Sequence, residues 1–278
     1  MRTVRFSALL LLFLFLLSGG CRSKPEPRAS LVFFDVGQGS AALLQTPGGN
    51  ILVDCGPESA QETLCRKLKS RGVEELQFLI LTHFDEDHIG GADLILEQFS
   101  VETVLYNGGI EENESAARLL AAAAQKDLSM TALDRDDEAI LGDLTITVLH
   151  PSDRNDPGKG NGSSLVFLAR YGECSVLFTG DADTDVEEEL IKRYGAERLS
   201  ATVLQVGHHG SATSSSSAFL EAVQPTYAVI SCGAGNTYGH PDGRILERLE
   251  QTGAIICRTD LEGDVTFFWE NSLLQKQD

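Results

Sequence analysis

The stretch LTHFDEDHIGG, residues 81–91, follows directly on the apolar run QFLIL (77–81). Four metal-capable side chains crowd into six positions of this stretch: His83, Asp85, Asp87 and His88. Carboxylates so close together repel one another unless a positive charge lies between them. Imidazole and carboxylate groups are ligands that zinc and manganese accept. The apolar run predicts a buried strand, so the stretch indicates a metal site at the end of that strand.

Further candidate ligands follow other apolar runs. The run VLFTGD (176–181) ends in Asp181, and LQVGHHGS (204–211) contains His208 and His209. The loop NTYGHPDG (236–243) contains His240. These places and the first stretch hold all the histidines except His150, which we interpret as structural. Asp35 and Asp54 also end apolar runs, and we expect them to hydrogen-bond ligands or loops rather than to bind metal.

Alternating apolar segments predict the fold class, α/β. Runs 31–37, 40–46 and 50–56 indicate an antiparallel meander, and helical spacing marks 62–72, 90–99 and 114–127. In the second half, strands and helices continue to alternate, and AIICRT (254–259) with DVTFFWE (264–270) is typical of a terminal hairpin. An acidic helix over 183–194 is interpreted as a solvated face. Two mixed sheets packed face to face with helices outside, a four-layer αββα sandwich, would bury these runs.

The N-terminus is typical of a targeting segment. Arg2 and Arg5 precede the apolar run 6–17, which is short for a membrane span, and SGG precedes Cys21. We expect residues 1–20 to be a signal peptide, Cys21 to carry a lipid, 21–30 to be a tether and 31–278 to be one large globular domain. The protein would then be an extracytoplasmic, membrane-anchored lipoprotein, with a secreted or periplasmic protein as the alternative.

Composition excludes some classes of protein. The formal net charge of −19 disfavours broad electrostatic binding of nucleic acid. Besides Cys21, five scattered cysteines without a CxxC motif exclude a disulfide framework and a zinc finger. The hydrophobic content of 42% is that of an ordinary globular core.

Taken together, several segments resemble the metallo-β-lactamase superfamily, and more narrowly the hydrolase domain of the ComEC DNA-uptake proteins. The resemblance spans residues 31 to about 270 and is carried by FFDVGQGSAALL, NILVDCG, LTHFDEDHIGG, GNGSSLVFLARYGECSVLFTGD, LQVGHHGS and SCGAGNTYGHPDG. It implies the metallo-β-lactamase fold and two divalent metal ions, Zn or Mn. It also implies a phosphodiester substrate, single-stranded DNA among the possibilities.

The resemblance also implies roles for individual residues. His83 and Asp85 would bind one metal, Asp87 and His88 the second, Asp181 would bridge both, and His240 would complete the second centre. His208 is an additional ligand and His209 a neighbouring or proton-transfer group, or the reverse; Asp87 and His209 are the candidate catalytic residues. Asn161, Ser163 and Ser164 stand where most members of the superfamily have a ligand histidine, and we expect Asn161 and Ser163 to support the ligands.

Three functions remain open at this point. The first is a metal-dependent phosphodiesterase or nuclease that acts through a hydroxide held between two metals, linked to DNA uptake. The second is hydrolysis of a lactone, lactam or thioester on the same fold. The third is a membrane-tethered accessory protein with a vestigial metal site.

Overall fold

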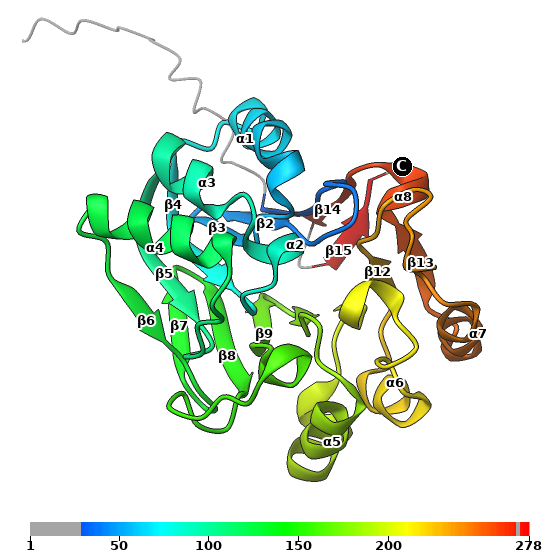
Figure 1. Ribbon diagram of the computed structural model, residues 1–278. Coiled ribbons are helices and arrows are strands. Elements are labelled where there is room, and N and C mark those ends of the chain that lie inside the picture. Colours follow the sequence, from blue (N-terminus) through cyan, green and yellow to red (C-terminus); the bar gives the residue numbers. More distant parts are fainter. Residues whose placement is uncertain (1–28, 271–272, 278) are drawn as a thin grey trace, which may run out of the picture.

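The computed structural model describes residues 29–270 and 273–277. These residues form two mixed sheets packed against each other, with helices on both outer faces (Figure 1). The predicted four-layer α/β sandwich is therefore confirmed. The predicted signal peptide, Cys21 and the tether as far as residue 28 lie outside the described residues. In the described part of the chain, no helix has the length and apolar character that crossing a bilayer requires.

The first sheet has eight strands in the order β15-β14-β1-β2-β3-β4-β5-β6. Strands β1 to β3 pair antiparallel, as the meander predicted, and β3 to β6 pair parallel. The strands are β1 (Ser30–Phe33), β2 (Ala42–Thr46), β3 (Gly49–Val53), β4 (Glu75–Leu81), β5 (Ser100–Tyr106), β6 (Met130–Ala132), β14 (Val265–Glu270) and β15 (Leu273–Lys276).

The second sheet has seven strands in the order β13-β12-β11-β10-β9-β8-β7. Strands β7 to β10 pair antiparallel and β10 to β13 pair parallel. The strands are β7 (Glu138–Leu141), β8 (Leu144–His150), β9 (Val166–Tyr171), β10 (Cys174–Phe178), β11 (Val203–Gln205), β12 (Tyr227–Ile230) and β13 (Ile255–Arg258).

Helices cover the outer face of each sheet. The apolar sides of α1, α3 and α4 pack on the first sheet, and those of α5, α6 and α7 pack on the second. The helices are α1 (Gln61–Ser70), α2 (Glu86–Ile89), α3 (Ala92–Gln98), α4 (Glu114–Gln125), α5 (Thr184–Leu199), α6 (Ser217–Val223), α7 (Gly243–Thr252) and α8 (Thr259–Glu262). Three single turns of 3₁₀ helix are η1 (Glu58–Ala60), η2 (Gly160–Ser163) and η3 (Gly207–Gly210).

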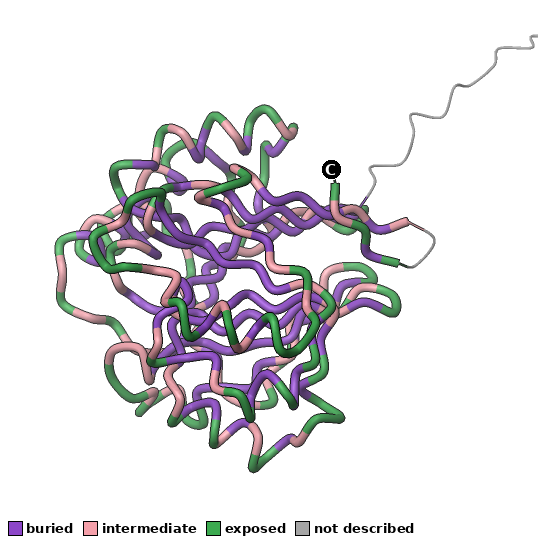
Figure 2. Tube along the Cα trace, turned by 90° about the vertical axis from the view of Figure 1, so that its right-hand side faces the viewer, coloured by how far each residue is buried: buried purple, intermediate pink, exposed green. Residues whose placement is uncertain are grey.

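The central core lies between the two sheets, where both contribute inward-facing side chains. The ring centroids of Phe33 in the first sheet and Phe178 in the second are 6.0 Å apart. Phe178 in turn stacks on Phe167, with 4.8 Å between the ring centroids. Figure 2 shows the buried strands at the centre and the exposed chain at the rim. Close packing of aromatic rings across the layers fixes how the two sheets lie against each other, and the site described below draws residues from both.

The predicted terminal hairpin is wrong. Strand β13 pairs with β12 in the second sheet, whereas β14 pairs with β1 in the first. The turn of helix α8 and Gly263, at φ +73°, carry the chain from one sheet to the other. Alternation of apolar residues predicts that a segment is a strand but does not identify the strand it pairs with, which is why two neighbouring strand-like runs suggested a hairpin.

One acid of the helix over 183–194 departs from the interpretation as a solvated face, although Asp185 and Glu188 are exposed. Glu187 in α5 is buried and accepts the backbone N–H groups of Ser215 and Ser216, the latter at 2.8 Å. Burial raises the pKa of Glu187, and the two backbone N–H donors oppose that rise. This carboxylate therefore anchors the turn that follows η3, where two candidate metal ligands lie.

Replacing Glu187 by alanine would leave two buried N–H donors without a partner. We expect Glu187→Ala to lower the free energy of unfolding by about 1–3 kcal/mol, measured by chemical denaturation. Glu188→Ala, at an exposed position of the same helix, is the matched control and should change it by less than about 0.5 kcal/mol. Equal effects of the two substitutions would contradict an anchoring role for Glu187.

Candidate metal centre

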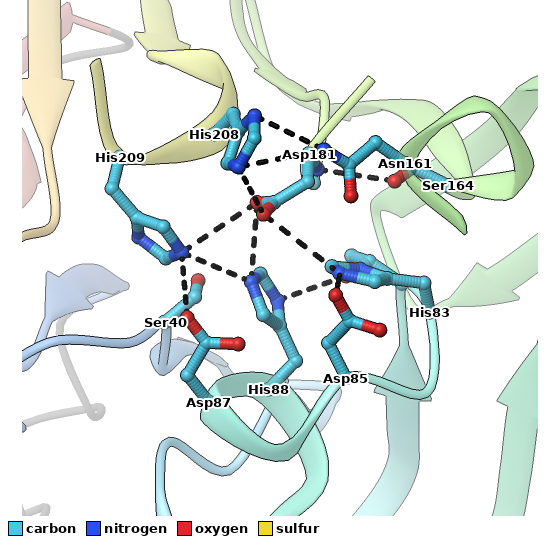
Figure 3. A network of polar contacts seen from close by, with 12 residues as sticks. Ser40, His83, Asp85, Asp87, His88, Asn161, Ser164, Asp181, His208 and His209 are labelled. Atoms are coloured by element: carbon cyan, nitrogen blue, oxygen red, sulfur yellow. Dashed lines mark hydrogen bonds and ion pairs between the residues drawn. The ribbon is translucent and has the colours of Figure 1, made fainter. Parts of the chain in front are cut away.

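Four strand ends deliver the candidate ligands and the residues that support them to one edge of the sandwich (Figure 3). In the first sheet, β3 ends just before Asp54 and β4 ends two residues before His83. In the second, β10 is followed by Asp181 and β11 by the η3 turn with its two histidines. Each of these strand pairs is parallel, so the ends of both pairs lie side by side.

Asp181 lies at the centre of this cluster, with only 3% of its surface exposed. Its Oδ1 is 3.1 Å from His88 Nε2 and 3.7 Å from His209 Nε2. Its Oδ2 is 3.6 Å from His208 Nε2 and 3.9 Å from His83 Nε2. One buried carboxylate therefore presents two oxygens to two separate pairs of imidazoles.

The Oδ1 side of Asp181 forms a compact set of four ligand atoms. His209 Nε2 lies 3.2 Å from Asp87 Oδ2 and 3.3 Å from His88 Nε2. A tetrahedral ion with ligands at 2.0–2.1 Å separates its ligand atoms by about 3.4 Å. Asp87, His88, His209 and Asp181 therefore fit around one divalent ion, and the first three also stand out as a compact metal-capable group.

The Oδ2 side forms a more open set. His83 Nε2 is 3.6 Å from Asp85 Oδ2, and Asp181 Oδ2 lies between His83 and His208 at 3.9 Å and 3.6 Å from their Nε2 atoms. His83 Nε2 and Asp181 Oδ1 are buried, and neither has a hydrogen bond of good geometry. Buried polar atoms are rarely left without a partner, so these two atoms support the fit of metal ions at this centre.

His88 is oriented by Asp54. The two side chains are completely buried, and His88 Nδ1 donates to Asp54 Oδ2 at 2.8 Å. Asp54 Oδ1 in turn accepts the backbone N–H of Thr82 at 2.9 Å. A carboxylate on Nδ1 fixes the tautomer that leaves the Nε2 lone pair free for a metal. Because Nε2 has only one lone pair, His88 can coordinate only one metal ion.

The η3 turn brings in His208 and His209 through an unusual backbone. His208 has φ +50° and His209 has φ +54°, and Gly210 follows at φ +82°. A left-handed conformation costs a non-glycine residue roughly 1–2 kcal/mol. The two rings are held on their outer sides: His209 Nδ1 donates to the Ser231 carbonyl at 2.8 Å, and His208 Nδ1 lies 3.1 Å from the Thr213 hydroxyl.

Charges of the cluster are strongly coupled in the metal-free state. Burial disfavours the charged form of His88, but Asp181 and Asp54 outweigh it and raise its pKa well above the usual value. Burial also disfavours the charged form of His209, but Asp181 and Asp87 outweigh that effect and raise the pKa of His209. Against the opposing effect of burial, the surrounding imidazoles hold the pKa of Asp181 well below its usual value. A metal ion would have to displace the protons on these histidines, so its apparent affinity should fall as pH falls.

Acids of the first stretch respond to the same imidazoles. The hydrogen bond from His83 lowers the pKa of Asp85. Burial raises the pKa of Asp87, but His209 and His88 outweigh it and bring the value to about 2. Both side chains are therefore carboxylates at neutral pH, which is the form that binds a metal.

The predicted supporting residues lie in different places. Asp35 accepts the backbone N–H of Gly37 at 3.1 Å and touches no candidate ligand in the described contacts, so it shapes a loop. Asn161 Nδ2 lies 3.1 Å from His208 Nδ1 and 3.4 Å from its Nε2, so Asn161 contacts a candidate ligand, as expected. Ser163 bonds the Gly160 carbonyl at 2.7 Å instead of a ligand.

The neighbouring Ser164 has a role that the sequence did not single out. Its hydroxyl accepts the Asp181 backbone N–H at 3.1 Å. Gly180, which directly precedes Asp181, has φ +51°, and a Cβ there would lie 3.1 Å from the Ser164 Cβ. The glycine therefore lets the Asp181 turn approach the segment that contains Asn161 and Ser163.

His209 groups with Asp87 and His88 in the structure, whereas His240 was expected to complete this second centre. In the structure His240 belongs to neither compact ligand group, and its ring lies 5.7 Å from that of His208. His209, the predicted neighbour, lies against Asp87 and Asp181 instead. The geometry therefore favours His209 over His240 as the fourth ligand of the second centre, and His208 as a ligand of the first.

A cavity of about 390 Å³ opens over the ligands. Its lining residues are Gln38, Asp85, Glu86, Asp87, Asp181, His208, His209, Tyr238 and His240. A larger cavity of about 510 Å³, beside Phe84 and the η2 turn, holds none of the candidate ligands. The smaller cavity is therefore the candidate substrate site, and His150, buried under the η2 turn with Nε2 on the Gly162 carbonyl, lies outside it.

Comparison with known proteins agrees with this geometry. The family model described as "Metallo-beta-lactamase superfamily" matches residues 34–234. The chain is 32% identical over 255 residues to "ComE operon protein 3" of Bacillus subtilis, covering 85% of this chain and 32% of that protein. It is 36% identical over 249 residues to "Competence protein ComA" of Neisseria gonorrhoeae, covering 87% and 33%. The chain thus spans about a third of the length of these relatives.

Among solved structures, Igni18, titled "a novel metallo hydrolase" from Ignicoccus hospitalis, has a TM-score of 0.57 and 19% identity. The match covers 87% of this chain and 100% of that one. At this identity the likeness shows the fold alone.

The Asp54–His88 pair offers a test of the centre. We expect Asp54→Asn to weaken the binding of Zn²⁺ or Mn²⁺ by roughly 10–100-fold, because His88 loses the carboxylate that orients it. Chelator competition or calorimetric titration measures this affinity. Asp35→Asn, at a loop carboxylate away from the ligands, is the matched control and should bind as the unchanged protein does. An Asp54 variant with unchanged affinity would contradict the orienting role.

Proposed function

The chain belongs to the metallo-β-lactamase superfamily and is a hydrolase of that fold related to competence proteins; we propose that it is a metal-dependent phosphodiesterase. Asp181 is the observation that carries the proposal: a buried carboxylate whose oxygens lie 3.1–3.9 Å from four imidazoles. Two aspartates, Asp85 and Asp87, adjoin it at the cavity. So much negative charge in one place suits two divalent cations.

The residues that would hold the ions fall into two sets. His83, Asp85, Asp181 and His208 would hold the first, and Asp87, His88, His209 and Asp181 the second. When bound, two such ions supply a nucleophilic water at neutral pH and offset the negative charge that develops on a transferring phosphoryl group. Each set offers two imidazole nitrogens and two carboxylate oxygens, a mixture that Zn²⁺ and Mn²⁺ both accept.

The chain's own residues have distinct tasks in this mechanism. Asp54 and the Ser231 carbonyl fix the tautomers of His88 and His209, so that their inner nitrogens carry no proton when the ligands are in place. Asn161 contacts the His208 ring. His240 also lines the cavity, and its Nδ1 is buried without a hydrogen-bond partner.

A nucleic-acid substrate is supported by the names of the relatives, which refer to competence, and by the cavity at the surface. Asp85 at the position where most members of the superfamily have histidine argues against typical β-lactamase chemistry. Lactone, lactam or thioester hydrolysis remains the alternative on the same fold. The second alternative is an accessory protein with a vestigial metal site.

Metal content and substrate turnover test the proposal. We expect close to two Zn²⁺ or Mn²⁺ per chain after reconstitution and metal-dependent cleavage of bis-p-nitrophenyl phosphate and single-stranded DNA. Asp181→Asn should lower this rate on the order of 1000-fold, since stabilisation of the transition state by metals amounts to several kcal/mol. Nitrocefin turnover without diester turnover would favour the alternative hydrolysis. Less than one metal per chain with no turnover would favour the accessory protein.

We also propose that the protein acts outside the cytoplasm, tethered by a lipid on Cys21. The proposal is supported by Arg2 and Arg5, by the apolar run 6–17 and by the small residues before Cys21. Labelled fatty acid should be incorporated into the unchanged chain in bacterial cells and not into Cys21→Ser. Labelling of both forms, or of neither, would contradict the lipid anchor, and cleavage by an external protease would separately report the location.

A further inference from the structure

Lysine and arginine are missing from the described lining of the substrate cavity. Among the nine described residues that line it, there is no lysine or arginine, and Glu86 adds a carboxylate to those of the ligands. The formal net charge of the chain is −19. Electrostatic contacts with phosphates, which provide much of the affinity of ordinary nucleic-acid-binding proteins, are therefore unavailable here apart from those to bound metals. A polymeric phosphodiester would need a second, uncharged source of affinity.

Tyr238 is the feature of the cavity that can provide this affinity. It is 71% exposed, and it is the only aromatic side chain among the large, strongly exposed apolar residues of the described chain. Exposure of an aromatic ring to water is unfavourable unless a partner covers it. Its ring stacks on His240, with 5.8 Å between centroids and 26° between planes. One face of the ring is thus supported by the protein.

The position of Tyr238 relative to the metal ligands fits a strand of nucleic acid. The His240 ring contacts both the Tyr238 ring and the His208 ring, with centroid distances of 5.8 Å and 5.7 Å. His208 Nε2 is itself 3.6 Å from Asp181. A base on the free face of Tyr238 would therefore lie beside the same cavity as the metal ligands, and another part of the same strand would have its phosphate at the ligands.

The loop that carries Tyr238 is held in place. Asn236 Oδ1 accepts the backbone N–H groups of Tyr238 at 3.2 Å and His240 at 3.0 Å, and its Nδ2 donates to the His240 carbonyl. Gly233, where the loop begins, donates its N–H to Gln38 Oε1 at 3.1 Å. A ring on a braced loop loses little conformational freedom when it binds a ligand.

We propose that Tyr238 is a stacking platform for a nucleobase of the strand whose phosphate is bound at the metal ligands. Aromatic rings bind every base through its face, so the platform tolerates any sequence and favours single strands, whose bases are free. It would make the enzyme prefer nucleic acid to phosphodiesters without a planar group. The inference rests on the proposed phosphodiesterase function and adds the residue that recognises the bases.

The test compares two substrates of equal charge: oligothymidylate and the same sugar–phosphate chain without bases. We expect the full chain, loaded with metal, to cleave the first more efficiently. Tyr238→Ala should lower kcat/KM for oligothymidylate by roughly 5- to 150-fold, chiefly through KM, and leave the abasic chain unaffected. Tyr238→Phe should keep the preference because stacking does not need the hydroxyl. Leu261→Ala, at a residue equally exposed and outside the cavity, is the control.

Two results would overturn the inference. One is an equal loss on both substrates, which would indicate general damage to the site, and the other is an unchanged preference in Tyr238→Ala. If the unchanged protein cleaves neither oligomer nor bis-p-nitrophenyl phosphate, the proposed function fails instead. In that case, equilibrium binding of fluorescently labelled oligothymidylate and of the labelled abasic chain tests Tyr238 without turnover. The proposed role of Tyr238 stands if oligothymidylate binds more tightly and Tyr238→Ala removes the difference.

Discussion

The buried charge of Asp181 is the constraint on which the site depends. A carboxylate with almost no contact with water is stable only if positive charge lies beside it, and four imidazoles surround it. In the metal-free state the neighbouring carboxylates raise the pKa of His88 and of His209, which favours a proton among these imidazoles. Metal ions provide the positive charge more fully, because each ion meets several ligands at once. Protons and metals therefore compete for the same lone pairs.

Strain in the surrounding backbone follows from the same constraint. Asp54, His208 and His209 all adopt left-handed conformations that cost non-glycine residues free energy. The fold tolerates the cost because neighbouring contacts over-determine each position: Thr82 holds Asp54, and Ser231 holds His209. The contribution of the fold is to bring the ends of β3 and β4 against those of β10 and β11 across one aromatic core. Neither sheet alone holds a complete set of ligands.

Sequence reasoning succeeded where the information was local. The spacing from His83 to His88 predicted a cluster because six residues after a strand cannot move far apart, and alternation of apolar residues predicted the layers. It failed where the outcome depended on conformation or on pairing with distant strands. The order of His208 and His209 is decided by two left-handed residues, which the letters HHG do not reveal. Strand β14 joins β1 rather than β13, and buried Glu187 looked like any other acid of a solvated helix.

The distribution of charge narrows the substrates that suit the cavity. Four acids line its wall, and two divalent ions would offset their formal charge but leave no excess of positive charge for the substrate. Because like charges repel most strongly where water is excluded, each further negative charge on a substrate raises the cost of binding. A diester with one charge per phosphate therefore suits the cavity better than a monoester or a polyphosphate. Uncharged contacts, such as stacking on an exposed ring, then matter more for substrate specificity because they add affinity without adding repulsion.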